Sequence, residues 1–164
     1  MSAPSVQDEN QARLDQIKAD ILSKNICPDL AKQATQLVFG EGSPDATIVF
    51  IGEAPGESED SLGRPFVGPA GQLLHLIVSR AVPPGVRCAF TNLVCCIPRD
   101  EEGNKSGEPD PESFRACQPR LREFIQIADC PPDTRECGSL RLLVAVGSLA
   151  RDQLKPKYLH SLKP

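Results

Sequence analysis

Residues 46–74 read ATIVFIGEAPGESEDSLGRPFVGPAGQLL, an apolar run followed by a loop rich in glycine, proline and acids. The run Thr47–Ile51 predicts a buried strand, because it is short, apolar and rich in β-branched residues. The loop from Gly52 to Leu74 holds five glycines, three prolines and four acids. Glycine lets the backbone approach a ligand closely, and proline restricts the shape of a loop. Since open α/β sheets bind ligands at the carboxyl ends of their strands, this loop predicts polar chemistry at such an end.

The rest of the chain alternates between helical and strand patterns. After a first helix at 11–23 and the strand at 47–51, the patterns predict a helix at 70–81, a strand at 86–94, a helix at 110–127, a strand at 140–146 and a helix at 148–154. Asp110 as N-cap and Pro111 at the first helical position indicate where the third of these helices begins. This β-α-β-α-β-α order predicts an α/β fold with a parallel sheet and right-handed crossovers. Residues 1–9 are predicted to be disordered, and residues 10–164 to form a single domain.

Composition excludes several classes of protein. The chain has 164 residues, a net charge of −4 and seven cysteines. No segment reads as a membrane span or a secretory signal, so the sequence predicts a cytoplasmic protein without a membrane partner. An odd number of cysteines in that compartment argues against a disulfide scaffold and leaves metal ligands or buried thiols. The negative charge gives no overall attraction to nucleic acid, so any DNA contact needs a local basic patch.

The loop after the first strand does not match the common phosphate-binding motifs. It lacks the GxxxxGK[ST] lysine and the glycine spacing of a dinucleotide fingerprint, so no nucleotide cofactor is expected. The alternative to a functional loop is a tight turn carrying solvated acids. The fixed glycines and prolines around the acids favour the functional interpretation.

Several stretches resemble one known family. GEAPGESED at 52–60 and GRPFVGPAGQLL at 63–74 are similar to the first motif of the uracil-DNA glycosylase superfamily, with the closest resemblance to its family-4, iron–sulfur branch. TNLVCCIPRD at 91–100, PDPESFRACQPRL at 109–121 and LLVAVGSLA at 142–150 continue the resemblance in the same order. The resemblance implies a three-layer α/β/α fold with a short, mainly parallel central sheet. It also implies a DNA glycosylase that flips deoxyuridine out of DNA and hydrolyses its N-glycosidic bond, which starts base excision repair.

The resemblance implies a role for several residues in binding the base. Phe66 would stack on uracil, and Asn92 would bind its polar edge, because an amide supplies both a donor and an acceptor. The backbone amides of Gly52 and Gly56 would position the base and phosphates. The alternatives are a core phenylalanine after a proline and an asparagine that ends a strand in a turn.

Two acids of the loop would act on the reaction itself, again by resemblance. Glu53 occupies the position that faces the sugar and the attacking water, where a carboxylate orients water and stabilises positive charge on the sugar. Glu59 is the second acid of the motif and is expected to be catalytic. A solvated loop charge is its alternative.

The resemblance also implies a [4Fe–4S] cluster, but one cluster ligand is missing. Cys27, Cys96 and Cys117 match three of the four family cysteines, whereas the first position is Lys24, which cannot replace a thiolate. Three interpretations stay open. Another ligand completes the cluster; Cys95 substitutes, although neighbours in an extended segment point opposite ways; or the cluster is lost and the cysteines are buried thiols.

The C-terminal part is a second departure from the family pattern. The family continues to a further strand and a His-Pro-Ser-like motif whose histidine stabilises the departing uracil. Here His160-Ser161-Leu162 has only a superficial likeness, because it comes too early and no strand precedes it. Either this sequence is truncated or the histidine is absent. A monomeric enzyme acting on uracil-containing DNA is expected; the alternatives are a non-catalytic relative that binds DNA or uracil, and an iron–sulfur, redox-sensing module.

Overall fold

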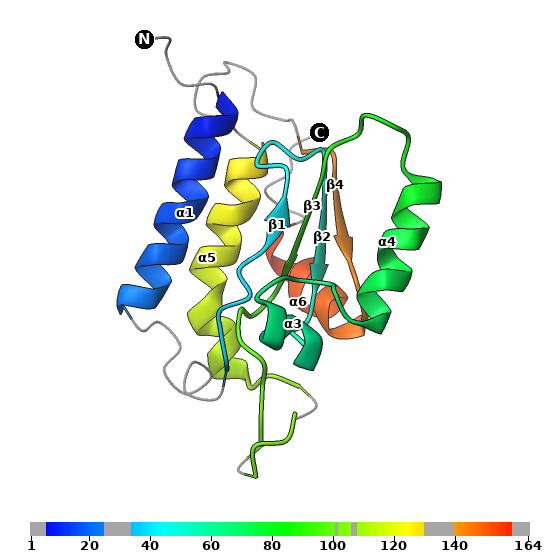
Figure 1. Cartoon of the computed structure of the whole chain (residues 1–164). Coiled ribbons are helices and arrows are strands. Elements are labelled where there is room, and N and C mark those ends of the chain that lie inside the picture. The colour runs from blue at the N-terminus through cyan, green and yellow to red at the C-terminus, as the bar shows by residue number, and fades with distance from the viewer. Residues whose placement is uncertain (1–5, 25–33, 101, 106–107, 130–139, 159–164) are drawn as a thin grey trace.

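A computed structural model describes residues 6–24, 34–100, 102–105, 108–129 and 140–158. Figure 1 shows a central sheet with helices on both sides. From α4 onward, helices and strands alternate along the chain. The helices are α1 (Val6–Lys24), α3 (Glu57–Leu62), α4 (Pro69–Ala81), α5 (Pro111–Asp129) and α6 (Ser148–Tyr158). The strands are β1 (Glu41–Gly42), β2 (Ile48–Gly52), β3 (Cys88–Asn92) and β4 (Leu142–Ala145).

The sheet is mainly parallel, as predicted. Its strand order is β1-β3-β2-β4. The central strand β2 pairs in parallel with both β3 and β4, and only the two-residue strand β1 runs antiparallel, against β3. The carboxyl ends of β2 and β3 therefore meet at one edge of the sheet, where the glycine-rich loop begins.

Both faces of β2 are buried, which explains its continuous apolar sequence. Val49 and Ile51 belong to the core cluster that also contains Leu121 and Phe124 of α5. On the opposite face, Phe50 stacks on Phe90 of β3 with ring centroids 5.0 Å apart. His75 of α4 contacts the same Phe90 ring at 4.6 Å, so α4 covers the face that α5 does not. The described elements thus form the three layers expected from the resemblance.

Helix α5 begins where its sequence predicts. The carboxylate of Asp110 accepts hydrogen bonds from the amides of Glu112, at 2.8 Å, and Ser113, at 3.0 Å. Pro111 occupies the first helical position, where its missing N–H costs nothing. The hydrogen bonds from Ser113 lower the pKa of Asp110, because they stabilise the charged cap.

The structure differs from the sequence-based prediction at the N-terminus and in two short elements. Residues 6–9, expected to be disordered, form the first turns of α1, where Asp8 and Glu9 favour the positive end of the helix dipole. Asn10 of the same helix is fully buried, and its side-chain amide donates to the carbonyl oxygen of Pro44 at 3.4 Å. The short elements β1 and α3 carry no periodic apolar pattern, so the sequence did not predict them.

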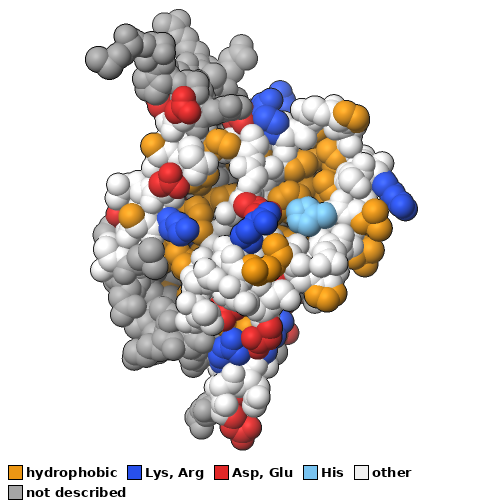
Figure 2. Space-filling model, viewed as in Figure 1, with side chains coloured by type: hydrophobic (Ala, Val, Ile, Leu, Met, Phe, Trp, Pro, Cys, Tyr) orange, Lys and Arg blue, Asp and Glu red, His pale blue; other side chains and the backbone are white. Residues whose placement is uncertain are grey.

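The surface carries acids, bases and apolar groups in mixture. On the face shown in Figure 2, Lys and Arg side chains lie in small, separate groups, with Asp and Glu nearby. Three apolar side chains of α4 are about half exposed, namely Leu73, Leu76 and Ile77. No helix within the described residues has the length and apolar character that crossing a membrane requires.

Candidate active site

The carboxyl ends of β2 and β3 place Gly52 and Asn92 side by side. The two residues are partners in the parallel register, and the amide of Leu93 donates to the carbonyl oxygen of Gly52 at 2.9 Å. Asn92 is only 4% exposed. Its side-chain amide, with two donors and an acceptor, therefore lies at the end of the sheet where α/β folds bind ligands.

Gly52 lies between Asn92 and Phe66. A methyl group added at Gly52 would collide with the side-chain oxygen of Asn92 and would come within 2.8 Å of the Phe66 ring. The site therefore needs glycine for space, since the backbone conformation of Gly52 does not require it. This contact brings an aromatic ring and an amide, 26 residues apart in sequence, around one backbone position.

Phe66 is held in an uncommon backbone conformation. Its φ of 55° makes it the one non-glycine residue with positive φ among the described residues, a state that costs about 1–3 kcal/mol. A side chain at Gly71, in the first turn of α4, would collide with the Phe66 backbone, so the two segments pack directly on each other. The Phe66 ring also meets Phe90 edge to face, with centroids 6.0 Å apart. Packing from several sides thus supports a conformation that the residue alone disfavours.

Glu59 ties the two halves of the loop together. One carboxylate oxygen accepts a hydrogen bond from the amide of Gly68 at 2.8 Å, and the other accepts one from the amide of Gly56 at 3.1 Å. The second bond is half of a capping box at the start of α3. The expected catalytic acid therefore has both oxygens on backbone amides, in a position that fixes the loop around Phe66.

Asp60 ties the glycine-rich loop to two distant segments of the chain, and the sequence analysis did not predict this role. Asp60 is 1% exposed; both of its carboxylate oxygens accept from the single N–H of Thr35, and one also accepts from Arg99 at 3.2 Å. Arg99 also makes a bidentate pair with Glu57, at 2.8 and 2.9 Å. Since these partners lie 25 to 42 residues apart in sequence, no local pattern pointed to the network.

Glu53 follows Gly52 directly and is partly buried. Burial raises the pKa of its carboxyl group, the negative charge of Glu108 raises it further, and Lys105 lowers it. Both neighbours belong to the polar segment between β3 and α5. Among the described residues, none donates a hydrogen bond to this carboxylate. Glu53 thus has a raised pKa and carboxylate oxygens that accept no hydrogen bond from a described residue. Both features suit a group that orients water.

Comparison with known proteins assigns the family. The model of the uracil DNA glycosylase superfamily matches residues 39–161, which include the loop, Asn92 and α5. The chain belongs to the uracil-DNA glycosylase superfamily. It is similar to the type-4 uracil-DNA glycosylases of Sulfurisphaera tokodaii, with 40% identity over 115 residues, and Thermotoga maritima, with 39% over 127 residues. The alignments cover 70% and 76% of this chain, and 50% and 56% of the two relatives.

A third relative supports the same branch of the superfamily. The type-4 uracil-DNA glycosylase of Pyrobaculum aerophilum is 43% identical over 104 residues, which is 62% of this chain and 48% of the relative. The chain thus spans about half the length of these curated relatives. The resemblance to the family-4 branch is confirmed, and with it the α/β fold of a uracil-DNA glycosylase.

The structure describes two of the three cysteines that match the family-4 pattern. Cys96 and Cys117 are each 5% exposed and belong to one core cluster, whereas Cys27 lies outside the described residues. Burial and the neighbouring Cys117 raise the pKa of Cys96 to about 11. Among the described residues, no group of three or more His, Cys, Asp or Glu side chains is placed to hold a metal ion.

Cys95 also faces Cys117, which differs from the expectation for an extended segment. Residues 93–96 form a bend after β3, so consecutive side chains need not point to opposite sides. The thiols of Cys95 and Cys117 share a hydrogen bond, which together with full burial raises the pKa of Cys95 well above its ordinary value. Cys95, Cys96 and Cys117 therefore lie close together in the glycosylase-like core.

Arg120 is a second residue that sequence reasoning missed. It is 3% exposed, in the core-facing row of α5 that also holds Cys117, Leu121 and Phe124. An arginine in an otherwise apolar helical stripe was the signal that could have revealed it. Its guanidinium donates to the backbone carbonyl of Asn92 at 2.7 Å, so it contacts the strand end of the site.

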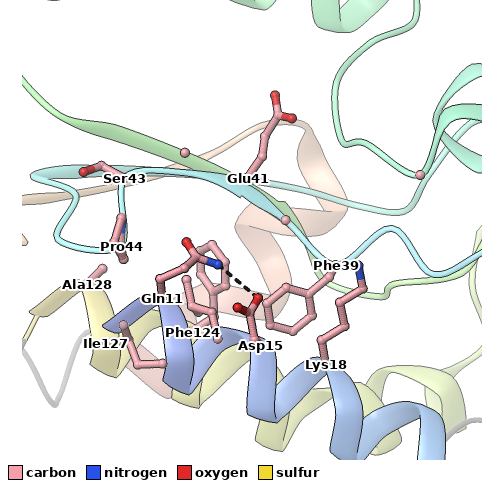
Figure 3. Close-up of a pocket in the computed structure, with 14 residues that line it drawn as sticks. Gln11, Asp15, Lys18, Phe39, Glu41, Ser43, Pro44, Phe124, Ile127 and Ala128 are labelled. Carbon is pink, nitrogen blue, oxygen red and sulfur yellow. Dashed lines mark hydrogen bonds between the residues drawn. The ribbon is translucent and has the colours of Figure 1, made fainter. Parts of the chain in front are cut away.

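A pocket elsewhere in the molecule has no residue in common with this site. It has a volume of about 300 Å³ and opens between α1, α5 and the segment around β1. Figure 3 shows Phe39 and Phe124 in its wall, with Gln11, Asp15 and Lys18 of α1 alongside. Gln11 donates to Asp15 at 3.1 Å. Gly52, Glu53, Phe66 and Asn92 do not line this pocket.

Proposed function

We propose that this protein is a uracil-DNA glycosylase that hydrolyses the N-glycosidic bond of deoxyuridine in DNA. The observation that carries the proposal is the placement of Gly52 between the ring of Phe66 and the amide of Asn92. Water adds to C1′ of the sugar, the C1′–N1 bond breaks, and uracil leaves with the bonding electron pair and takes up a proton. The products are uracil and an abasic site in the DNA.

The flipped base binds at the ends of β2 and β3. Phe66 stacks on the uracil ring, a sequence-tolerant contact that contributes about 1–3 kcal/mol per base. Asn92 supplies specificity, because its amide donates to a carbonyl oxygen of uracil and accepts from the ring N–H. The absence of a side chain at Gly52 lets the Phe66 ring and the Asn92 amide pack against one backbone position, and the backbone amides of Gly52 and Gly56 position the base and phosphates.

Glu53 and Glu59 have different roles in the proposed reaction. Glu53 orients the attacking water and stabilises the positive charge that develops on the sugar. Glu59 acts as a positioning residue, since its hydrogen bonds to Gly56 and Gly68 fix the loop that presents Phe66. This assignment refines the catalytic role that the resemblance implied for Glu59.

The family-4 resemblance is the support for a [4Fe–4S] cluster, since the described residues alone form no metal-binding group. Cys96 and Cys117 supply two adjacent thiol ligands, Cys27 is the third, and the fourth is open between Cys95 and another group. The buried guanidinium of Arg120 beside these thiols, with an unpaired Nε, suits an anionic group. If bound, the cluster would be held by Cys96 after β3 and Cys117 of α5, and it would stabilise the contact between these two segments.

Uracil-containing DNA is the proposed partner. The mixed surface of Figure 2 and the net charge of −4 favour local contacts with phosphates over a broad basic face. The monomeric state and the cytoplasmic location stay predictions.

The decisive experiment measures uracil release from oligonucleotides that contain one deoxyuridine, single-stranded and paired with guanine or adenine. The Thermotoga maritima relative serves as a parallel positive control. Release of free uracil with formation of an alkali-labile abasic site is the expected result. Binding to the uracil oligonucleotide without turnover would identify a non-catalytic relative and reject the proposed hydrolysis.

We expect two substitutions near Glu53 to shift the acidic limb of the pH–rate profile in opposite directions. Since Glu53 must be ionised, the rate rises with pH through the pKa of Glu53, which burial raises above its ordinary value. Glu108→Gln removes a negative neighbour, lowers the pKa of Glu53 and moves the acidic limb to lower pH. Lys105→Met removes a positive neighbour and moves the limb to higher pH.

Single-turnover rates from pH 4 to 8 measure these shifts, which should be small because the charges of exposed side chains are screened. Raising the salt concentration should shrink both shifts. If the limb moves in the same direction in both variants, Glu53 is not the group that titrates.

A further inference from the structure

The segment between β3 and α5 extends past the carboxyl ends of the parallel strands, beside α3 (Figure 1). Arg99 and Lys105 of this segment pair as an isolated antiparallel bridge. In the turn between them, the Asp100 carboxylate accepts from the amides of Glu102, at 3.0 Å, and Asn104, at 2.8 Å. The amide of Asp100 also donates to the carbonyl of Asn104 at 2.8 Å. These hydrogen bonds within the turn give Lys105 a defined backbone position.

The turn is attached to the glycine-rich loop through Arg99, which forms the bidentate pair with Glu57 at 2.8 and 2.9 Å. The attachment brings the side chain of Lys105 over the loop. The Lys105 ammonium lies 3.8 Å from the position that a Cβ on Gly56 would occupy. It is also close enough to Glu53 to lower the pKa of that carboxyl group. Lys105 therefore lies at the rim of the candidate active site.

Lys105 differs in its partners from the other two cations beside this loop. Arg64 pairs with Glu41, and Arg99 pairs with Glu57, each at 2.8 Å. Within the part of the chain that the structure describes, no carboxylate forms an ion pair with Lys105, whose side chain is exposed. An ammonium group has three donors and no acceptor. Lys105 is thus placed to bind an anion that comes from outside the protein.

The acids of the loop are the rivals for the Lys105 ammonium. Both carboxylate oxygens of Glu59 already accept hydrogen bonds from backbone amides, those of Gly56 and Gly68. Glu53 is near enough to interact through charge, but the described structure contains no hydrogen bond between Glu53 and Lys105. The loop therefore leaves the donors of Lys105 available for an external oxygen.

A DNA strand brings phosphates to this position. A nucleotide whose base contacts Phe66 and Asn92 and whose sugar faces Glu53 carries a phosphate on each side of that sugar. The four acids of the loop repel these phosphates, and the net charge of −4 gives no general attraction to DNA. A cation at the rim of the loop offsets the repulsion where the strand must approach most closely.

We propose that Lys105 binds a DNA phosphate next to the flipped deoxyuridine and thereby sets the position of its sugar relative to Glu53. This inference rests on the proposed glycosylase function and adds a residue to its DNA-binding surface. The contact carries no sequence information, because phosphates are the same at every nucleotide. Lys105 is a positioning residue, and recognition of uracil stays with Phe66 and Asn92.

The first test measures affinity of the full chain for a single-stranded oligonucleotide over a range of salt concentrations. The oligonucleotide carries one 2′-fluoro-2′-deoxyuridine, because the fluorine disfavours positive charge on the sugar and slows cleavage. Lys105→Met removes the charge, Lys105→Arg keeps it, and Lys18→Met removes an exposed lysine of α1 as a matched control with the same change in net charge.

Lys105→Met should weaken binding at low salt by roughly threefold to tenfold. It should also reduce the slope of log affinity against log salt by about 0.7, the contribution of one phosphate contact on a single strand. Lys105→Arg should keep the wild-type slope, and Lys18→Met should change neither quantity. Equal slopes for Lys105→Met and Lys18→Met would reject the phosphate contact.

The second test locates the phosphate. In a set of oligonucleotides, one phosphate at a time on either side of the analogue is replaced by a neutral methylphosphonate. One replacement next to the analogue should weaken binding of wild-type protein and of Lys18→Met, yet have no further effect in Lys105→Met, because the contact is already lost. Additive effects at every position, or a small loss of additivity spread over all positions, would overturn the proposal.

The two tests also separate this inference from the proposed glycosylase function. A wild-type preference for the uracil analogue over thymidine, combined with additive effects at every phosphate, rejects the role of Lys105 and leaves base recognition intact. If wild-type protein binds both oligonucleotides equally, the proposed recognition of uracil fails. In that case, a smaller salt slope for Lys105→Met than for Lys18→Met on the thymidine oligonucleotide still supports a phosphate contact at Lys105, and equal slopes reject it.

Discussion

Replacing Glu53 with glutamine is expected to slow uracil release by roughly 10²–10⁴-fold and to leave the affinity for uracil-containing DNA nearly unchanged. Glutamine keeps the shape of the side chain but carries no charge, so it neither accepts a proton from water nor stabilises a cationic sugar. The Glu53 carboxylate accepts no hydrogen bond from a described residue. Its pKa is raised because burial disfavours the charged form. The loss should therefore appear in the single-turnover rate and not in the dissociation constant.

The control for this change is Glu123→Gln, which removes an exposed carboxylate from α5 and should leave the rate at the wild-type value. The thermal midpoints of both variants should also stay near wild type. A Glu53→Gln protein that keeps more than a tenth of the wild-type rate would show that another group orients the water.

Replacing Gly52 with alanine is expected to slow uracil release by about 10²-fold or more, since displacements of about 1 Å in a site have effects of that size. The new methyl group meets the Asn92 oxygen and the Phe66 ring, at 2.8 Å from the latter. Asn92 is fixed by the sheet, so the ring and the amide must move apart and the base loses its fit. Unlike the change at Glu53, this one should weaken affinity for uracil DNA as well as the rate.

Gly85→Ala is the matched control for the glycine substitution. Gly85 has a φ of +88° and open space around it, in the turn between α4 and β3. Alanine there should lower the thermal midpoint through backbone strain without affecting uracil release. Full activity in Gly52→Ala, measured on protein shown to be folded, would mean that the base does not contact Phe66 and Asn92.

The elements that the sequence predicted are those with local causes. The strand at β2 followed from an apolar run buried on both faces, and α5 from the cap at Asp110 and the proline after it. The meeting of Gly52 and Asn92 followed from parallel strand order, because carboxyl ends of parallel strands share one edge. By contrast, β1 has two residues and α3 has six, which is too short for a periodic pattern.

The parts that the sequence did not predict depend on contacts between distant segments. The four acceptors of Arg120 lie 27 to 81 residues away in sequence, and Asp60 meets Thr35 and Arg99 at comparable separations. The bend at residues 93–96, which brings Cys95 and Cys96 toward Cys117, also arises from packing. Residue types alone suggested which groups were chemically useful, but their partners depended on the fold.

The left-handed backbone conformation of Phe66 indicates that the entropy of ordering the loop is lost when the protein folds and not when the base binds. The hydrogen bonds of Glu59 and the close packing of Gly71 hold this conformation through contacts within the protein itself. The aromatic surface is therefore preorganised, and an arriving base does not have to immobilise it. More of the contact energy then remains as affinity, and the loop should keep the same conformation with uracil bound as without it.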